Sequence, residues 1–558
     1  MERKFKSLMK LSFSLVLILF LSCNSNEDTS FDSLSYSFEK WYFKNHPVEA
    51  SLKSYKIYDD YFLSNDFKTK ERYLLDMKRF YFELTQIDNI NLSMINQFKY
   101  DRIKKILTKS IYLIEKVKVD ETKPSKLLNE IKFGLLYLVN YNSSMQSIQK
   151  RLSQIKSLLS NSLISITNVS DGEYKKCQII IDDIVLILEN IQLNLDFKND
   201  FYSDVVEISK KNIREIKKYK NNLKSMKTQY NVNNNKLNLD NLHFKTITDS
   251  DYELDVVFKK AKKTLSIYQK KIFNNTIDFF LKENDEPVWV DYDDTLYVIN
   301  YVVQKIKNQN KIENFKYVQD SYEKFGLNRF LDINFSYYDN SFDYFYLREN
   351  LSLIIPYDSN KSSSKKINVN LPKSPLKTLN VYDKKATYYN EIQIDLLNAY
   401  KFYPGEHHIF NFSNPKLITN RIPNKTTLRG LQRYAERVFI KTNKKASLQH
   451  QIIHEYNIIN DICKCIVDNE YHIKNTNTNK LLNYLQINCF MNENEAKSNL
   501  DFITSSVFGE SSTNFIGISK ILEIEQDFIG ESKNYLKFYN KYLVNGVLEL
   551  ENLHKNFQ

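Results

Sequence analysis

Glycine and proline are so scarce in this sequence that most folds built on tight turns are excluded. The 558 residues contain nine Gly and nine Pro, about 3% together, whereas proteins average about 12%. Sandwiches, propellers and doubly wound sheets need such residues in their many turns, and long helices do not. With 42% hydrophobic residues, including 36 Phe and 39 Tyr, the chain can bury a large core. We therefore predict a mainly α fold.

Hydrophobic periodicity supports this prediction and locates one exception. Apolar residues recur every three or four positions, as in Ile180, Ile184, Ile187 and Ile191, which is typical of one buried helix face. Between residues 330 and 383 the period shortens to that of strands, with candidate strands at 343–347, 351–355, 367–371 and 379–382. We expect a single large helical domain over residues 36–558 with a small β element near residues 330–383.

The N-terminus has the pattern of an export signal. Four basic residues in the first ten precede an apolar run at residues 11–21, which is too short to cross a bilayer as a helix. The sequence F-L-S-C at residues 20–23 resembles the lipobox of bacterial lipoproteins, in which the cysteine is diacylated and becomes the first residue of the mature chain. We predict a signal peptide at residues 1–22, lipidation of Cys23, a flexible tether over residues 23–35 and a lipid-anchored position in the bacterial cell envelope.

The net charge limits the classes of partner that we expect, and the cysteine spacing limits the kinds of metal or redox site. Removal of the signal peptide lowers the formal charge from +12 to about +9, carried as lysines spread along helices, so we expect a solvated surface and no nucleic-acid partner. Cys463 and Cys465 have the wrong spacing for a zinc knuckle or a C-x-x-C pair. We interpret them as buried thiols.

Four blocks in the C-terminal half, in region 384–530, carry a family resemblance. They are Y-K-F-Y-P-G-E-H-H at residues 400–408, G-L-Q-R-Y-A-E-R at 430–437, I-V-D-N-E-Y-H at 466–472 and the glycine pair at 509 and 517. In order and spacing they resemble H-E-x-x-P-G-H-H and three later motifs of the bacterial family catalogued as domain of unknown function 885. The resemblance implies a helical, zinc-peptidase-like architecture for nearly the whole mature chain.

Departures from the family motif fall on the positions that zinc chemistry requires. With the Pro-Gly pair aligned, Tyr400 and Lys401 replace the first His ligand and the catalytic Glu, and Arg429 replaces a Glu in the second block. Glu406 stands at the first position of the His pair, and His407 keeps the second. Cations in place of carboxylates repel a divalent metal. The sequence thus favours a metallopeptidase-like scaffold without its catalytic residues, and we expect no cofactor.

Two histidine arrangements leave metal binding open. A shifted, low-affinity zinc cluster could use Glu406, His407, His408 and His472. His450 and His454 have the i, i+4 spacing of H-E-x-x-H with Gln451 where the base belongs. We interpret this second pair as a chance pair on an exposed helix face.

Arginine is used sparingly, yet it clusters near these blocks. Only 12 Arg occur beside 67 Lys, and Arg429, Arg433 and Arg437 follow one another at four-residue intervals, which places them on one helix face. They could hold an anionic group such as a peptide C-terminus. Alternatively they serve a structural role, paired with Glu436 and other carboxylates.

Three functions remain open at this stage. The first is a lipid-anchored envelope protein with a degenerate metallopeptidase-like domain, non-catalytic, that binds a peptide or an anionic group. The second is an active, divergent zinc-dependent peptidase, and the third is a scaffold or surface lipoprotein without a functional pocket. Membrane contact through the N-terminal lipid is common to all three.

Overall fold

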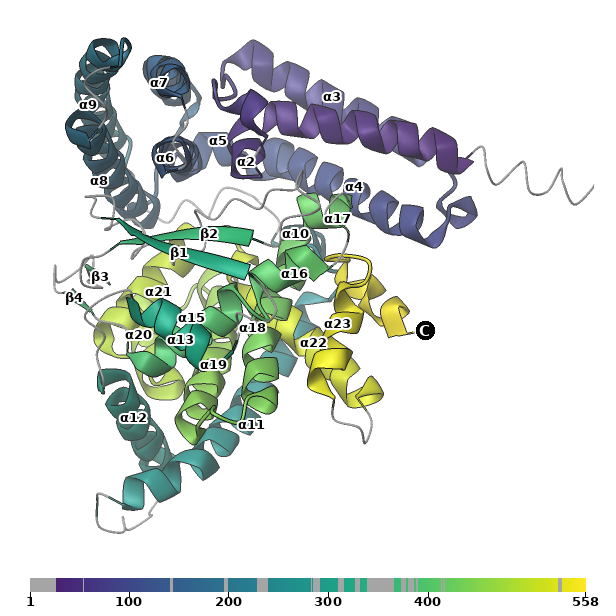
Figure 1. Cartoon of the computed structure of the whole chain (residues 1–558), viewed down its shortest axis with the longest axis vertical. Helices are drawn as coiled ribbons and strands as arrows, with labels where there is room; N and C mark the ends of the chain where they lie inside the picture. Colours follow the sequence, from purple (N-terminus) through teal and green to yellow (C-terminus); the bar gives the residue numbers. More distant parts are fainter. Residues whose placement is uncertain are drawn as a thin grey trace, which may run out of the picture.

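The computed structural model describes residues 27–557, except for positions 54, 141–143, 195–198, 228–238, 283, 285–291, 310–315, 327–331, 339–365, 373–377, 380–385, 388–389, 413, 415–416 and 530–533. Side chains are not described for a few further residues within these elements. The signal peptide, Cys23 and the candidate strands at 343–347 and 351–355 lie outside the described residues. The mainly α prediction is confirmed (Figure 1).

The N-terminal helices begin with an unlabelled helix at residues 27–45. The helices that follow are α2 (Pro47–Leu52), α3 (Phe67–Thr85), α4 (Met94–Tyr112), α5 (Val119–Thr122), α6 (Ser125–Asn140), α7 (Met145–Ser165), α8 (Asp171–Asn194) and α9 (Tyr202–Ser225). Short η turns are η1 (Lys56–Tyr58), η2 (Asn89–Asn91) and η3 (Leu113–Val117).

The C-terminal part is also mainly helical. Its helices are α10 (Asn241–Thr248), α11 (Leu254–Leu281), α12 (Tyr292–Asn308), α13 (Lys316–Lys324), α15 (Glu391–Lys401), α16 (Glu406–Phe412), α17 (Ile418–Arg421), α18 (Lys425–Thr442), α19 (Leu448–His472), α20 (Thr478–Cys489), α21 (Glu493–Ser505), α22 (Thr513–Phe528) and α23 (Tyr535–Leu543), with η6 (Glu510–Ser512) and η7 (Leu550–Phe557).

The described residues of the predicted β element form two small pairs of strands. Strands β1 (Asp332–Tyr338) and β2 (Lys366–Pro372) pair in parallel with Asp332 opposite Lys366, and β3 (Thr378–Leu379) pairs antiparallel with β4 (Ala386–Thr387). The candidate strand at 367–371 lies within β2; of the one at 379–382, residue 379 belongs to β3 and residues 380–382 lie outside the described residues.

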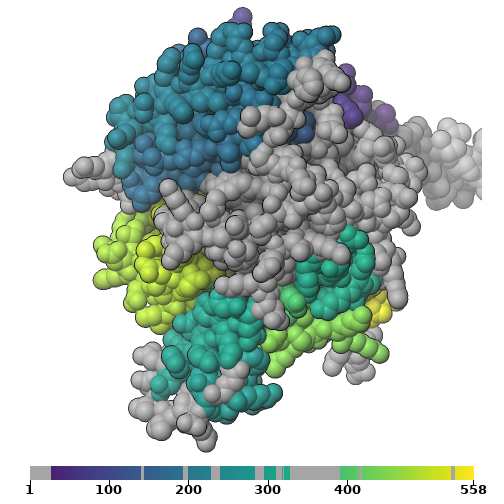
Figure 2. Space-filling model, turned by 60° about the vertical axis from the view of Figure 1, so that its left-hand side comes forward, coloured from purple at the N-terminus to yellow at the C-terminus, as the bar shows by residue number. Residues whose placement is uncertain are grey.

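Three hydrophobic clusters form the interior. One lies among the helix of residues 27–45, α3 and α4, a second joins α6 to α9, and the largest extends from α10 to the C-terminal helices. Ile180, Ile184, Ile187 and Ile191 are all buried in the second cluster, as their periodicity predicts. Figure 2 shows this second group of helices as a blue lobe above the yellow-green and teal C-terminal elements.

Buried arginines connect distant segments. Arg102 on α4 donates hydrogen bonds from Nε to the Ile422 carbonyl (2.7 Å) and from Nη1 to Glu549 (3.0 Å). It therefore connects an N-terminal helix to a segment near the C-terminus. Arg151 on α7 donates to the Gly134 carbonyl (2.8 Å) and to Ser51 Oγ (2.7 Å). Such buried donors are costly unless paired, and both guanidinium groups find acceptors on other elements, although Nε of Arg151 is buried without a partner among the described residues.

The described part of the predicted tether, residues 27–35, is helical. Phe31 is fully buried in the first cluster. The polar residues before Phe31 suggested a flexible segment, but burial of its ring and of Phe38 stabilises the helix through tertiary contact. No described helix is both long and apolar enough to cross a membrane.

Candidate functional site

The Pro-Gly turn lies between α15 and α16 and brings their ends close together. Helix α15 begins at an Asn390–Gln393 capping box and ends at Lys401, and α16 starts at Glu406, directly after Gly405. A Cβ at Gly405 would lie 2.0 Å from the Tyr400 carbonyl oxygen. The turn therefore requires glycine because the backbone folds back onto the last turn of α15.

Lys401 and Glu406 face each other across this turn. The Lys401 ammonium lies 3.1 Å from Glu406 Oε2, and Gln432 on α18 donates to the same oxygen at 2.6 Å. Lys401 also lies over the Tyr400 ring, 5.0 Å from its centroid. Lys401 and Glu406 thus both take part in internal contacts. One Glu406 oxygen is shared by the Lys401 ammonium and the Gln432 amide.

His407 and His408 are buried among aromatic rings. The His407 ring stacks on Phe402 with centroids 5.5 Å apart, and burial lowers the pKa of His407 to about 4. His408 contacts Tyr403 and donates a hydrogen bond from Nε2 to Asn540 Oδ1 at 2.9 Å. Both imidazoles are therefore neutral at pH 7 and packed in the core.

His472 lies in a different environment, at the end of α19. Its Nε2 is 3.3 Å from the Ile503 carbonyl oxygen and 3.6 Å from Asp468 Oδ1, and its ring packs against Phe508. Among the described residues no group of three or more His, Cys, Asp or Glu side chains could hold a metal ion. Glu406, His407, His408 and His472 have separate sets of partners, and zinc binding by them stays a prediction.

Helix α18 presents Arg433 and Arg437, two members of the arginine row, to three carboxylates of the chain. Arg433 donates Nε to Asp461 Oδ2 (2.8 Å) and Nη1 to Glu436 Oε1 (2.5 Å). Burial alone would lower the pKa of Arg433, but these two carboxylates outweigh burial and raise it. Arg437 forms a bidentate pair with Glu525, with all three contacts between 3.0 and 3.2 Å. Carboxylates of the chain itself therefore occupy both guanidinium groups.

Arg429 differs from the other two members of the row. Its Nη1 donates to Thr513 Oγ1 at 2.5 Å, and within the described part of the chain it has no carboxylate within 4 Å. Lys464, one turn after Asp461 on α19, lies in the same neighbourhood. Burial lowers the pKa of Lys464, Asp461 opposes that effect, and Arg433 and Arg429 reinforce it. The periodicity of α18 pointed to Arg429, whereas no sequence pattern singled out Lys464.

The interpretation of His450 and His454 as an exposed pair is wrong. Both are buried, with 3% and 4% of their surface exposed, because each binds a carboxylate contributed by another helix. His450 Nε2 lies 3.0 Å from Asp395 Oδ2, and His454 Nδ1 lies 2.8 Å from Glu436 Oε2. Sequence spacing alone could not reveal these partners, which are 55 and 18 residues away.

The later motif glycines have a packing role. Helices α18 and α22 meet backbone to backbone at Gly430 and Gly517: a Cβ at Gly517 would lie 2.2 Å from the Thr426 oxygen, and one at Gly430 only 2.4 Å from the Gly517 carbonyl carbon. Gly509 precedes η6 with φ of +97°, a conformation that favours glycine. These positions hold α22 against the arginine row.

One cysteine prediction is also corrected. Cys463 forms a disulfide with Cys489, which joins α19 to α20, whereas Cys465 is a free, buried thiol as expected, and Cys177 is also free and buried. The spacing of Cys463 and Cys465 carried no information about Cys489, because the pairing depends on how α20 folds back on α19.

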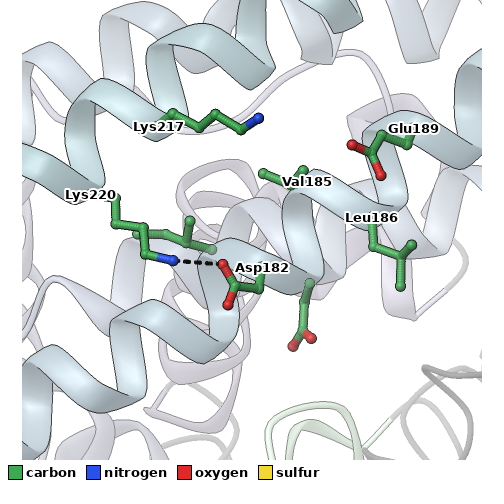
Figure 3. Close-up of a pocket in the computed structure, with 8 residues that line it drawn as sticks. Asp182, Val185, Leu186, Glu189, Lys217 and Lys220 are labelled. Atoms are coloured by element: carbon green, nitrogen blue, oxygen red, sulfur yellow. Dashed lines mark hydrogen bonds and ion pairs between the residues drawn. The ribbon is translucent and has the colours of Figure 1, made fainter.

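One cavity is lined in part by the arginine row, and another lies in the N-terminal half of the chain. Arg437 lines an open groove of about 600 Å³ between α11 and α22, together with Lys263, Tyr268 and Leu522. A second cavity, of about 460 Å³, lies between α8 and α9, far along the chain from the motif blocks (Figure 3). Lys220 and Asp182 form an ion pair of 2.8 Å at its edge. Open grooves lined by paired charges do not by themselves define a catalytic site.

Comparison with known proteins places the fold. No protein family matches the chain, and neither does any curated protein sequence. A solved structure from Shewanella oneidensis, described as a candidate lipoprotein of unknown function, matches with a TM-score of 0.67 at 14% identity, over 94% of this chain and 99% of that one. A candidate lipoprotein from Colwellia psychrerythraea matches with a TM-score of 0.65 at 11% identity, over 95% and 98%.

The chain shares their fold. At these identities the similarity extends to architecture over nearly the full length and does not assign an activity.

Proposed function

We propose that the chain is a bacterial envelope lipoprotein, anchored through an acylated Cys23, with a metallopeptidase-like helical domain that no longer hydrolyses peptides. The signal-like N-terminus supports the anchor, and both similar structures are described as candidate lipoproteins. The Cys463–Cys489 disulfide is consistent with an exported protein, since disulfides persist mainly in oxidising compartments.

One observation carries the non-catalytic part of the proposal. Three carboxylates near the motif positions are each engaged by a cation of the chain: Glu406 by Lys401, and both Asp461 and Glu436 by Arg433. A zinc ion needs carboxylate or imidazole ligands free to converge on it, and a carboxylate free to accept a proton from bound water. The residues at these positions do not fit that requirement.

Arg429 supports a binding role for the same region. It is partly buried, it donates to a neutral hydroxyl instead of a carboxylate, and Lys464 contributes a second positive charge nearby. A planar guanidinium beside an ammonium suits a carboxylate ligand. We propose that this end of the arginine row binds an anionic group such as a peptide C-terminus.

Catalysis is tested by metal analysis and peptide hydrolysis on the purified protein. We expect substoichiometric zinc, and the same background hydrolysis in the wild type and in His407→Ala. Near-stoichiometric zinc, together with turnover that His407→Ala abolishes, would contradict the proposal and favour an active divergent peptidase.

Binding is tested by calorimetric titration with a tetra-alanine peptide that has a free C-terminus and with its C-terminal amide. We expect binding of the free acid only, and loss of that binding in Arg429→Gln. Arg79→Gln is the matched control, because Arg79 is an exposed arginine on α3 whose side chain is 58% exposed. Equal behaviour of the two variants would contradict the proposed role of Arg429.

A scaffold without a functional pocket is the second candidate. It is favoured by Phe402 and Tyr403, which pack against the His407 and His408 rings and fill the space behind the Pro-Gly turn. No binding of either peptide, with no effect of Arg429→Gln, would support it.

Lipidation is tested separately by the mass of the N-terminal peptide and by fractionation of cells. We expect the mass of a diacylated Cys23 and recovery of the protein with membranes, and we expect Cys23→Ser to release it into the soluble fraction.

A further inference from the structure

The turn between α3 and α4 carries an exposed apolar surface that no intramolecular contact explains. Ile90 in η2 is 84% exposed, and Met94 and Ile95 at the start of α4 are 51% and 47% exposed. We call these three residues the apolar tip. Isolated exposed apolar residues are common, but three within six positions form a local patch.

The first described residues of the chain are fixed to this tip. Asp28 accepts hydrogen bonds from the backbone N–H of Ser93 (3.1 Å) and from Asn96 Nδ2 (2.8 Å). Glu27 Oε1 accepts a hydrogen bond from Asn91 Nδ2 at 3.4 Å. Figure 1 shows the helix of residues 27–45 starting at the same end of the molecule as the α3–α4 turn. The chain therefore enters the folded domain beside the apolar tip.

The distance from this entry point to the anchor is short. Cys23 precedes Glu27 by four residues, and four residues span at most about 14 Å when extended. The polar zone of one bilayer leaflet is roughly 5–8 Å thick. An acyl chain on Cys23 thus holds the α3–α4 turn at the membrane surface.

The charge around the tip argues for apolar contact and against electrostatic attraction. Glu27, Asp28 and Asp88 surround it, and Asp88 caps η2. Acidic side chains are not drawn to anionic lipid headgroups. The complementary occupant for this patch is therefore the apolar boundary beneath the headgroups.

We propose that the apolar tip inserts into the membrane that holds the lipid anchor, so that Ile90, Met94 and Ile95 orient the domain with the α3–α4 end down. This inference rests on the lipid anchor of the proposed function. It adds a fixed orientation, with the α3–α4 turn of the domain against the bilayer.

The test is a depth measurement by spin labelling of the full-length protein reconstituted in phosphatidylethanolamine and phosphatidylglycerol vesicles. A nitroxide is attached at Ile90→Cys, and the matched control is Ile164→Cys, which is 85% exposed. Ile164 lines a groove with Phe67 at the opposite end of α3, and α3, with 19 residues, is about 28 Å long. The free cysteines Cys177 and Cys465 are buried and should not be labelled.

We expect the ratio of oxygen to nickel-chelate accessibility at residue 90 to rise several-fold on reconstitution, and the ratio at residue 164 to stay unchanged. The rise should be the same in phosphatidylcholine vesicles, because the contact is apolar. A residue 90 label that remains as accessible to the nickel chelate as the residue 164 label overturns the inference.

The mass of the N-terminal peptide from the same samples separates this inference from the anchor. An acylated Cys23 with no membrane signal at residue 90 refutes insertion of the apolar tip and supports the lipid anchor. An unmodified Cys23 with a membrane signal at residue 90 refutes the anchor and keeps the tip, whereas loss of both observations refutes both.

Discussion

Gly517 should be intolerant of even one added methyl group. It lies within α22, where replacement of glycine by alanine normally stabilises a helix by about 1 kcal/mol. The structure reverses this sign, because a Cβ at residue 517 would approach the Thr426 carbonyl oxygen to 2.2 Å, and ordinary contacts begin at 3.4 Å. The obstacle is backbone and cannot rotate away, so α18 and α22 must separate by roughly 1 Å.

The magnitude follows from these two opposing effects. Overpacking of a dense interior costs about 1–3 kcal/mol, and rigid backbone on both sides places Gly517→Ala at the upper end. After subtraction of the helix propensity gain of about 1 kcal/mol, we expect a net loss of roughly 2 kcal/mol. Displacement of α22 should also weaken the contact between Thr513 and Arg429.

The assay is chemical denaturation followed by far-ultraviolet circular dichroism, with Gly172→Ala as the matched control. Gly172 lies in the first turn of α8, and its nearest neighbour is the Thr504 hydroxyl at 3.1 Å, a side-chain atom that can move. We expect Gly172→Ala to change stability by no more than about 0.5 kcal/mol. A Gly517→Ala protein as stable as Gly172→Ala would refute the close-packing argument.

Three further predictions concern single groups in the C-terminal half. Cys463→Ala removes the link to Cys489, 26 residues away, and should cost about 3–4 kcal/mol in denaturation under oxidising conditions, with no loss between the two proteins under reducing conditions. Burial holds the pKa of His407 near 4, below its unfolded value of 6.5, so the unfolded chain binds the proton first and stability falls as the pH drops from 6.5 towards 4. At pH 5 this amounts to about 2 kcal/mol, and His407→Phe should flatten the pH dependence of the denaturation midpoint by that amount. Arg433→Met removes the cation that pairs with the buried carboxylates Asp461 and Glu436 and should cost about 3–5 kcal/mol in the same assay, whereas Arg79→Met should be nearly neutral, and equal midpoints would contradict the pairing.

The general character of the fold could be read from the sequence because it depends on local rules. Scarcity of glycine and proline, with a 3.6-residue period, predicts long amphipathic helices, and the isoleucine face of α8 is buried as expected. The motif glycines could also be found, since they stand out in a chain with so few. Their physical role could not, because the close approach of α18 to α22 involves residues nearly ninety positions apart.

For the candidate site, too, the sequence predicted some residues, and the structure was needed to identify their partners. The sequence located Lys401, Glu406 and the arginine row, and it left open whether the arginines bind a ligand or carboxylates of the chain. The structure supplies Asp461 and Glu525 as partners for Arg433 and Arg437, and it identifies Lys464 beside Arg429. Spacing could not assign these partners, since each comes from a helix whose position depends on the whole core.

By itself, then, the sequence determined that this chain folds into helices and that its N-terminus resembles a lipoprotein signal, and it supported the proposal that cations stand where a metallopeptidase would need ligands. Only the tertiary structure decided which charges neutralise one another, that His450 and His454 are buried on carboxylates, that Cys463 pairs with Cys489, and that the chain enters its fold beside an apolar tip. The physical reason is the sequence separation over which each kind of interaction acts. Helix propensity and periodicity act over a few residues, whereas burial and charge pairing act across space, between segments that only the packed core brings together.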